Sequence, residues 1–429
     1  MKRRPVTRRE FMTTAGKAGL GAVGACSIPA ALGWGARPAM AQGSPRPFKI
    51  GYAMSLTGVF GKEGGMVRDA YELWKEKVNA EGGIEVKGKR HPVETVYYDD
   101  KSVPATAAKL SEKLISDDKV DLILGSHGSG HVFAASAVTE KARFPTISGG
   151  ASANRLFERG FKYYFSTLGK TTDEVRGAVD VFSIANPKPR TAAIIGSDIL
   201  FTALAVEGFK QYAAKNQIEV VHQELFPVSL EDYNSMLNRV KQKNPDVLFV
   251  GSLLFVALKV MRAAKEVDFN PKAIAFGYGP TIPDFVRELG KDAEYAISAS
   301  EWVPGAPYEG PFFGSARDFS NLFQKRYGRE PDYLEAASAG AALALHLGIQ
   351  KAELTPGVDD AGRERLTAAI QKLDVMTFYG RIKFGADGAA EAHPPLAVQI
   401  QDGKKVAIFP ENVAEGKLRY PMKPWKARG

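Results

Sequence analysis

Three clusters of glycine and hydroxyl-bearing residues are the parts of this chain best suited to chemistry. They read Ser55-Leu56-Thr57-Gly58, Gly125-Ser126-His127-Gly128-Ser129-Gly130 and Ser148-Gly149-Gly150-Ala151-Ser152. Each follows a short apolar run, and Ser129 and Ser152 directly precede expected helical stretches. Free backbone N–H groups and serine hydroxyls at helix starts suit an anion such as a carboxylate. Ordinary tight turns and helix caps use the same residues, so the pattern alone leaves both interpretations open.

Enzymatic interpretations of these clusters fail on spacing. A hydrolase nucleophile needs glycine two residues before and after it, whereas Ser129 has His127 and His131 in those places. The glycines have the wrong order for a dinucleotide fingerprint, and the Lys-Ser/Thr pair of a P-loop is missing. The two histidines have the spacing of a helical zinc pair, but the glycines between them disfavour a helix and no glutamate lies between. We therefore expect no enzyme activity, no metal and no cofactor.

The surrounding pattern predicts how the clusters are positioned. Strand-like runs at 49–54, 93–98, 120–125 and 144–148 alternate with helical stretches, and a second strand–helix series begins near residue 191. This alternation predicts an α/β protein with two lobes, each a parallel sheet flanked by helices. Ligands of open parallel sheets bind outside the carboxyl ends of the strands, where the clusters fall. Glycines 58, 61, 64 and 65 predict a loop ahead of a helix over 67–78.

The N-terminal residues predict an export signal. Arg8 and Arg9 lie ahead of a small-residue apolar stretch that ends in Ala39-Met40-Ala41, the pattern a signal peptidase needs. We expect residues 1–41 to be a twin-arginine signal peptide and the protein to be periplasmic. A basic N-terminal arm is the alternative. Processing at Cys26 instead, as in a lipoprotein, would leave a lipid anchor.

Charge and apolar segments exclude several classes of partner. The chain carries a net charge of +9, but the first 41 residues hold seven basic residues against one acidic residue, which leaves about +3 for the rest. Those remaining charges are mixed in sign, so we expect no nucleic-acid partner. The most apolar later stretch, 336–349, is shorter than the ~20 residues of a membrane-spanning helix and is better interpreted as a buried helix.

Sequence motifs in the first half resemble a known family. The segment Gly51-Tyr52-Ala53-Met54-Ser55-Leu56-Thr57-Gly58, the run Val78-Asn79-Ala80-Glu81-Gly82-Gly83-Ile84 and Tyr98-Asp99-Asp100-Lys101-Ser102 are similar to the branched-chain amino acid-binding (Leu/Ile/Val-binding) proteins of bacterial ABC importers. The resemblance runs from about Ile50 to Phe409. It implies a type I periplasmic binding protein fold, in which two lobes close like a Venus flytrap.

The same resemblance implies three crossings between the lobes, near 166–171, 298–303 and 376–384. The first lobe would then comprise 48–168 with 303–378. The second would comprise 169–302 with 379–413, followed by a C-terminal tail at 414–429.

The resemblance also implies the site residues. The ligand carboxylate would be held by Ser129, Gly150, Ala151 and Ser152 of the first lobe. Phe60 and Phe201 occupy aromatic positions where relatives often have tyrosine, although packing between the lobes would explain aromatic residues there equally well. The implied ligand-binding set is Phe60, His127, Ser129, Gly150, Ala151, Ser152, Phe201 and Tyr278.

One departure from the family bears on the ligand. Amino-acid binders usually pair the α-ammonium with an acidic residue in the loop that here reads Gly277-Tyr278-Gly279-Pro280-Thr281, with no carboxylate before Asp284. A buried ammonium without a partner is costly. This favours a carboxylate without an α-amino group, such as an aromatic or short-chain acid. An amino acid stays open because Glu301, beside a crossing, could pair with an ammonium.

The resulting expectation is a monomeric solute-binding component of an ABC importer. It would capture an amino acid or a related small carboxylate between closing lobes and deliver it to a membrane permease. Its membrane contact would be through that permease. The alternative is a periplasmic module that senses the ligand for a receptor or regulator.

Overall fold

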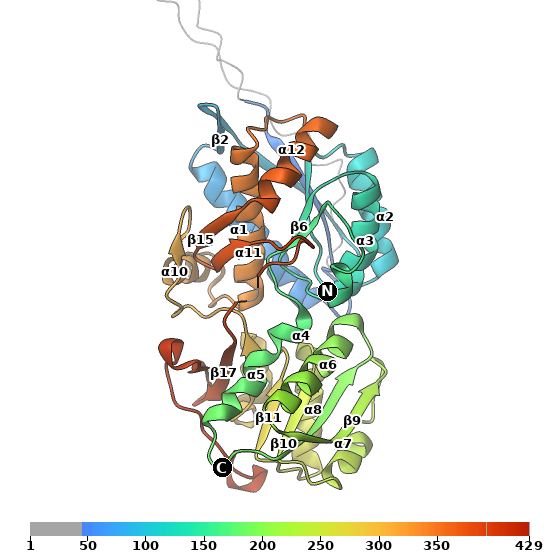
Figure 1. The fold of residues 1–429 in the computed structure, drawn as a ribbon, viewed down its shortest axis with the longest axis vertical. Helices are drawn as coiled ribbons and strands as arrows, with labels where there is room; N and C mark the ends of the chain where they lie inside the picture. Colours follow the sequence, from blue (N-terminus) through green and yellow to red (C-terminus); the bar gives the residue numbers. More distant parts are fainter. Residues whose placement is uncertain (1–44, 392, 429) are drawn as a thin grey trace, which may run out of the picture. The chain divides into compact units, whose positions relative to one another are not determined.

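The fold is seen in a computed structural model that describes residues 45–391 and 393–428. The expected signal peptide, with Arg8, Arg9 and Cys26, lies outside the described residues. From Pro45 onward the chain builds two α/β lobes around two separate sheets, as the alternating pattern predicted (Figure 1).

The sheet of the first lobe is entirely parallel. Its strands lie in the order β4 (Val93–Asp99), β1 (Phe48–Met54), β5 (Leu122–Leu124), β6 (Thr146–Ser148) and β7 (Tyr164–Ser166). Because the strands share one direction, the loops that follow β1, β5 and β6 meet at the same edge of the sheet. These loops are the three glycine and hydroxyl clusters.

Helices cover both faces of this sheet because parallel strands are buried on both sides. The helices of the first lobe are α1 (Gly61–Ala80), α2 (Pro104–Ser116), α3 (Ser129–Lys141), α10 (Ala316–Tyr327), α11 (Tyr333–Lys351) and α12 (Asp360–Gln371). Alternate residues of β5 show the two faces: Leu122 and Leu124 belong to the core that contains α1 and α11, whereas Ile123 packs with Leu114 of α2. The apolar stretch at 336–349 is the buried helix α11, as expected.

The second lobe has a mixed sheet. Its order is β18 (Lys404–Phe409), β17 (Leu396–Gln401), β12 (Ile297–Ser300), β11 (Ala273–Phe276), β10 (Val247–Gly251), β8 (Thr191–Ser197) and β9 (Glu219–Phe226). The neighbouring strands β12, β11, β10, β8 and β9 all pair in parallel. Strands β17 and β18 add an antiparallel hairpin at one edge. The helices of this lobe are α4 (Thr171–Glu174), α5 (Arg176–Asp180), α6 (Leu200–Lys215), α7 (Tyr233–Lys241), α8 (Leu254–Glu266) and α9 (Pro283–Leu289).

The chain passes between the two sheets three times. The first passage follows β7 and leads into α4, and the second follows β12. The third was expected at 376–384, but this stretch forms the hairpin β15 (Asp374–Thr377) and β16 (Gly380–Lys383), which turns the chain back. The Phe384 ring lies 5.3 Å from that of Phe165, and the N–H of Ala390 donates to the carbonyl of Ser166 (2.9 Å). The third passage therefore lies between Ala390 and β17.

This position shifts the lobe boundaries. We propose that the first lobe includes residues up to about 390 and that the second resumes at Leu396. The C-terminal residues pack back on the second lobe: the N–H of Met422 donates to the carbonyl of Lys272 (2.8 Å), and the indole N–H of Trp425 donates to the carbonyl of Phe269 (2.7 Å). The lobe boundaries and the tail at 414–429 stay proposals.

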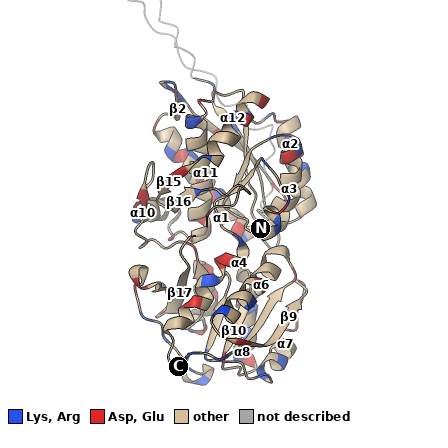
Figure 2. Cartoon of the chain, viewed as in Figure 1, with Lys and Arg blue, Asp and Glu red and all other residues tan. Residues whose placement is uncertain are grey.

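The remaining short strands pair locally. They are β2 (Ile84–Val86) with β3 (Lys89–His91), and β13 (Glu309–Gly310) with β14 (Gly314–Ser315). Basic and acidic residues are interspersed along both lobes (Figure 2), and many are paired, as in Arg326 with Glu76 and Lys265 with Asp292. In the described residues, every helix is too short or too polar to cross a membrane.

Candidate ligand-binding site

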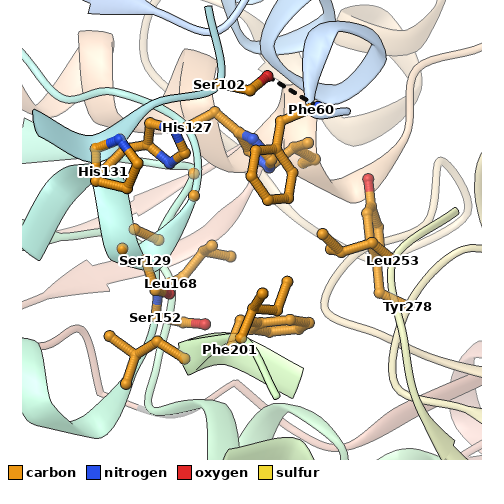
Figure 3. A pocket seen from close by; sticks show the side chains of 18 of the residues that line it. Phe60, Ser102, His127, Ser129, His131, Ser152, Leu168, Phe201, Leu253 and Tyr278 are labelled. Atoms are coloured by element: carbon orange, nitrogen blue, oxygen red, sulfur yellow. Dashed lines mark hydrogen bonds between the residues drawn. The ribbon is translucent and has the colours of Figure 1, made fainter. Parts of the chain in front are cut away.

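A cavity of about 410 Å³ lies at the loops of both lobes. Its volume is within the range of ~300–1,000 Å³ typical of small-ligand pockets. First-lobe loops after β5 and β6 meet second-lobe loops after β8, β10 and β11 there (Figure 3). All eight residues expected at the site line this cavity: Phe60, His127, Ser129, Gly150, Ala151, Ser152, Phe201 and Tyr278. The structure thus brings them together, and their contact with a ligand stays a prediction.

One end of the cavity is suited to an anion. Ser129 is the first residue of α3, where backbone N–H groups have no acceptor within the helix and the helix dipole favours negative charge. The Ser129 hydroxyl oxygen accepts from the N–H groups of Ser152 (3.4 Å) and Ala153 (3.2 Å). Those bonds fix the hydroxyl oxygen and leave its proton available to donate into the cavity.

Two glycines shape this end. Gly128 precedes α3 with φ of 88°, a left-handed conformation that side chains rarely adopt. At Gly149 a Cβ atom would lie 2.4 Å from the Cα of Ser338 in α11. The loop after β6 can therefore rest directly on α11, which holds Gly150 to Ser152 against the cavity.

The histidines lie beside Phe60 at the same end. The ring of Phe60 is 6.3 Å from that of His127 and 5.3 Å from that of His131, both edge to face. Burial, and secondarily His131, lowers the pKa of His127 to about 3, so its imidazole is neutral at physiological pH. His127 precedes α3 and His131 lies within it, so the pair does not share a regular helix face. A neutral imidazole can donate one hydrogen bond to a ligand.

The opposite wall is apolar. Phe201 projects from the start of α6 and faces the cavity from the side opposite Phe60 (Figure 3). The other apolar second-lobe residues there are Ile199, Leu200, Val228 and Leu253. The described residues that line the cavity include no lysine or arginine. The cavity therefore suits a ligand with one polar end and an apolar body.

Two polar contacts join the lobes beside the cavity. The Tyr278 hydroxyl donates to a carboxylate oxygen of Asp332 (3.1 Å), which caps the N-terminus of α11. Lys62 of α1 pairs with Asp284 of α9 (2.5 Å), and Arg287 also contacts this carboxylate. Asp284, the first acid after the Gly277–Thr281 loop, is thus paired outside the cavity. Because both contacts join the lobes, they would favour a closed arrangement.

Replacing Tyr278 with phenylalanine should weaken this closed arrangement. The variant keeps the ring at the cavity but removes the hydroxyl that Asp332 accepts from. A hydrogen bond to a charged group is worth ~1.5–3 kcal/mol, so we expect ligand affinity to fall about tenfold or more. Isothermal titration of wild type and Tyr278→Phe would check this. Equal affinity in the two proteins would show that the contact contributes nothing to closure.

Sequence reasoning missed one acidic lining residue, Glu174 of α4. One of its carboxylate oxygens, Oε2, accepts from the Ser152 hydroxyl (2.8 Å), and the other, Oε1, has no partner among the described residues. Burial and the neighbouring Glu301 raise the pKa of Glu174 well above its usual value. Its place directly after the first crossing put it near the cleft, but no pattern in the sequence marked it as the residue that lines the cavity.

Glu301, the acid that was expected to be able to pair with an ammonium, does not line the cavity. It is buried, and its carboxylate accepts from the Tyr379 hydroxyl (3.0 Å). Burial raises its pKa to about 7, although Tyr379 opposes the shift. Among these two acids, only Glu174 reaches the cavity.

Two lobes, one with a parallel sheet and one with a largely parallel sheet, three connections and a cavity between their loops define a two-lobed, type I periplasmic binding protein. The comparisons agree: residues 47–405 match the family described as Periplasmic binding protein, and the chain belongs to it. The sequence relatives described below are named Leu/Ile/Val-binding protein homologs, in agreement with the resemblance seen in the sequence. The family and fold are those of substrate-binding proteins, not enzymes.

Its relatives cover nearly the whole chain. Leu/Ile/Val-binding protein homolog 8 of Brucella abortus (strain 2308) is 27% identical over 400 residues, which cover 87% of this chain and 93% of the relative. Homolog 7 of the same strain is 24% identical over 409 residues, which cover 92% of this chain and 98% of the relative.

Two solved structures show the same fold. The branched-chain amino acid transporter substrate-binding protein LivJ from Streptococcus pneumoniae, in complex with isoleucine, has a TM-score of 0.72 at 21% identity and covers 84% of this chain and 98% of its own. An ABC transporter solute-binding protein from R. palustris, in complex with benzoate, has a TM-score of 0.71 at 20% identity and covers 84% of this chain and 95% of its own.

Proposed function

We propose that this protein is the periplasmic solute-binding component of an ABC importer for a small carboxylate with an apolar body. The class covers amino acids and related acids, aromatic acids included. The protein would be exported by the twin-arginine route, act as a monomer and deliver its ligand to a membrane permease. The observation that carries the proposal is one cavity with an anion-binding end at Ser129 and an apolar opposite wall around Phe201.

The relatives support the class of ligand without fixing it. One structural neighbour holds isoleucine and another holds benzoate. Both ligands combine a carboxylate with an apolar body, which is the chemistry that this cavity suits. The names of the sequence relatives point the same way.

The mechanism follows from where the lining residues lie. A carboxylate bound at Ser129 contacts the first lobe, and its apolar body contacts Phe201 and Leu253 of the second. A ligand that contacts both lobes binds the closed arrangement more tightly than an open one and shifts the population toward closure. The closed form would then dock on the permease.

Isothermal titration tests the proposal with four acids and two controls. We expect binding by at least one of leucine, isoleucine, phenylalanine and benzoate, because each has a carboxylate and an apolar body. Putrescine and glucose lack the carboxylate and should not bind. Failure of all four acids, or equal binding of a control, would contradict the proposal.

A further inference from the structure

Glu174 places an acid inside a cavity that otherwise suits a carboxylate. Only 7% of the residue is exposed, and it lines the cavity from α4, between the two lobes. Its Oε2 is held by the hydroxyl of Ser152, a residue at the anion-binding end. Its Oε1 is buried and has no hydrogen-bond partner among the described residues. A buried polar atom without a partner costs ~1–3 kcal/mol. A ligand group that donates a hydrogen bond to this carboxyl group would offset that cost.

The groups around Glu174 do not supply a cation. The charged residues that act on it are Glu301 and Asp173, and both are acidic. Its hydroxyl-bearing neighbours come from four other segments and are Ser152, Tyr164, Tyr333 and Tyr379. Arg176, on the next helix, acts on Asp173 but is paired with Asp180 (2.7 Å). Glu174 and Glu301, both buried, are thus close enough to raise the pKa of Glu174, and the charged groups acting on Glu174 in the described chain include no basic residue.

A purely structural role explains less of this arrangement. An amide or a hydroxyl in place of Glu174 could accept from Ser152 without placing a second acid beside Glu301. A buried acid pair is tolerated when at least one member stays protonated or when a cation arrives. The carboxyl group is buried, but Glu174 as a residue lines the cavity, so a cation would reach it with the ligand.

We propose that Glu174 receives the cationic nitrogen of the ligand, which is an α-amino acid with an apolar side chain, and that Glu174 loses its proton to the solvent as the ammonium binds. The proposal rests on the proposed function, because Ser129 and the start of α3 must hold the carboxylate of the same ligand. It also replaces the expectation that the ligand lacks an amino group. The acid that the second-lobe loop lacks is supplied from the crossing segment instead.

Proton release follows from the protonation state before binding. Burial and Glu301 raise the pKa of Glu174, so the carboxyl is protonated below that pKa. The ammonium favours the ionised form, and the proton therefore leaves to the buffer. Below the pKa of Glu174, amino-acid affinity should rise with pH by up to about tenfold per unit, because one proton leaves per ligand bound.

The test compares matched ligands that differ only in the amino group. Leucine is paired with 4-methylpentanoate and phenylalanine with 3-phenylpropanoate, and each is titrated calorimetrically in two buffers of different ionisation enthalpy. We expect wild type to prefer one amino acid over its deaminated analogue and, at a pH below the pKa of Glu174, to release up to one proton. In Glu174→Gln the affinity for the amino acid should fall by at least about 30-fold, which is the lower limit for truncating one partner of a buried charge pair. The release of a proton on binding should vanish.

The matched control is Asp173→Asn, which removes one negative charge from the neighbouring residue outside the cavity. It should keep the preference for the amino acid, and the pH dependence of binding should move to lower pH, because Asp173 contributes to raising the pKa of Glu174. Retained binding of the deaminated analogue, together with an unchanged circular dichroism spectrum, would show that Glu174→Gln is folded. If Glu174→Gln fails to fold, pH titration of wild type carries the test: affinity for the amino acid that is flat between pH 5 and pH 8 overturns the inference.

The outcomes separate the two proposals. If 4-methylpentanoate, 3-phenylpropanoate or benzoate binds and both amino acids do not, the carboxylate function stands and the role of Glu174 is overturned. Equal proton release in wild type and Glu174→Gln also overturns that role. If none of these five acids binds and isoleucine does not bind either, the proposed function fails and the inference fails with it.

Discussion

Replacing Gly64 with alanine should destabilise the protein by ~3 kcal/mol, while the same change at the next residue, Gly65, should stabilise it by up to ~1 kcal/mol. A Cβ atom on Gly64 would lie 1.8 Å from the carbonyl oxygen of Ser55. That oxygen belongs to the backbone, so it cannot rotate aside as the end of a side chain could. Overpacking of a rigid contact costs ~1–3 kcal/mol or more. At Gly65 the space is open, and alanine has the higher helix propensity.

Urea unfolding of the two variants and wild type would check this prediction. Both glycines lie in α1, so the pair separates close packing from helix propensity. The midpoint should fall in Gly64→Ala and rise slightly in Gly65→Ala. A midpoint for Gly64→Ala equal to or above that of wild type would show that the Ser55 loop yields to the added methyl group.

Replacing Ser129 with alanine should weaken ligand binding by about 10- to 100-fold. The change removes the hydroxyl proton offered to the carboxylate, and hydrogen bonds to charged groups are worth ~1.5–3 kcal/mol. It also removes the acceptor for the N–H groups of Ser152 and Ala153, which lie in the same lining. The loss of affinity would therefore have two causes: the missing hydrogen bond to the ligand, and a less well-fixed loop at Ser152 and Ala153.

The control for this variant is Ser111→Ala. Ser111 is also buried in the first lobe, but its hydroxyl donates only to the carbonyl of Ala107 within α2 (2.9 Å). Calorimetric titration with the tightest-binding acid of the panel should show normal affinity for Ser111→Ala and the loss for Ser129→Ala. An affinity for Ser129→Ala within twofold of wild type would remove Ser129 from the binding site.

Much of the first lobe could be predicted because its sequence patterns are local. The apolar runs that became β1 and β4 were placed within a residue of their ends. The glycine and hydroxyl clusters after β5 and β6 could be assigned to one edge, since parallel strands bring their carboxyl ends together. This is why the expected lining residues were found together without any contact being known.

Other features depend on packing that the sequence does not display. Glycines 61, 64 and 65 indicated a loop, yet they form the first turns of α1. At Gly64 the reason is the approach of Ser55, which comes from another segment of the chain. The hairpin of β15 and β16 was taken for a crossing strand, because a strand-like stretch such as 378–384 looks the same in either role.

The acid in the cavity was missed for a related reason. The family pattern places an acidic residue in the loop after β11, and in this chain that loop has none before Asp284. Glu174 enters the cavity from α4 because the first crossing runs beside the cleft. Which residue of a crossing segment faces the ligand depends on the three-dimensional path of the chain, so composition and spacing could not identify it.

The ion pair between Lys62 and Asp284 separates how tightly the protein binds from what it binds. The pair joins the lobes without lining the cavity, so it changes the population of the closed form and leaves the contacts of the ligand unchanged. An observed affinity scales with the fraction of protein in the competent form. Substitutions at this pair would therefore multiply the Kd of every ligand by one common factor, which lets affinity be adjusted to the local solute concentration while selectivity stays fixed.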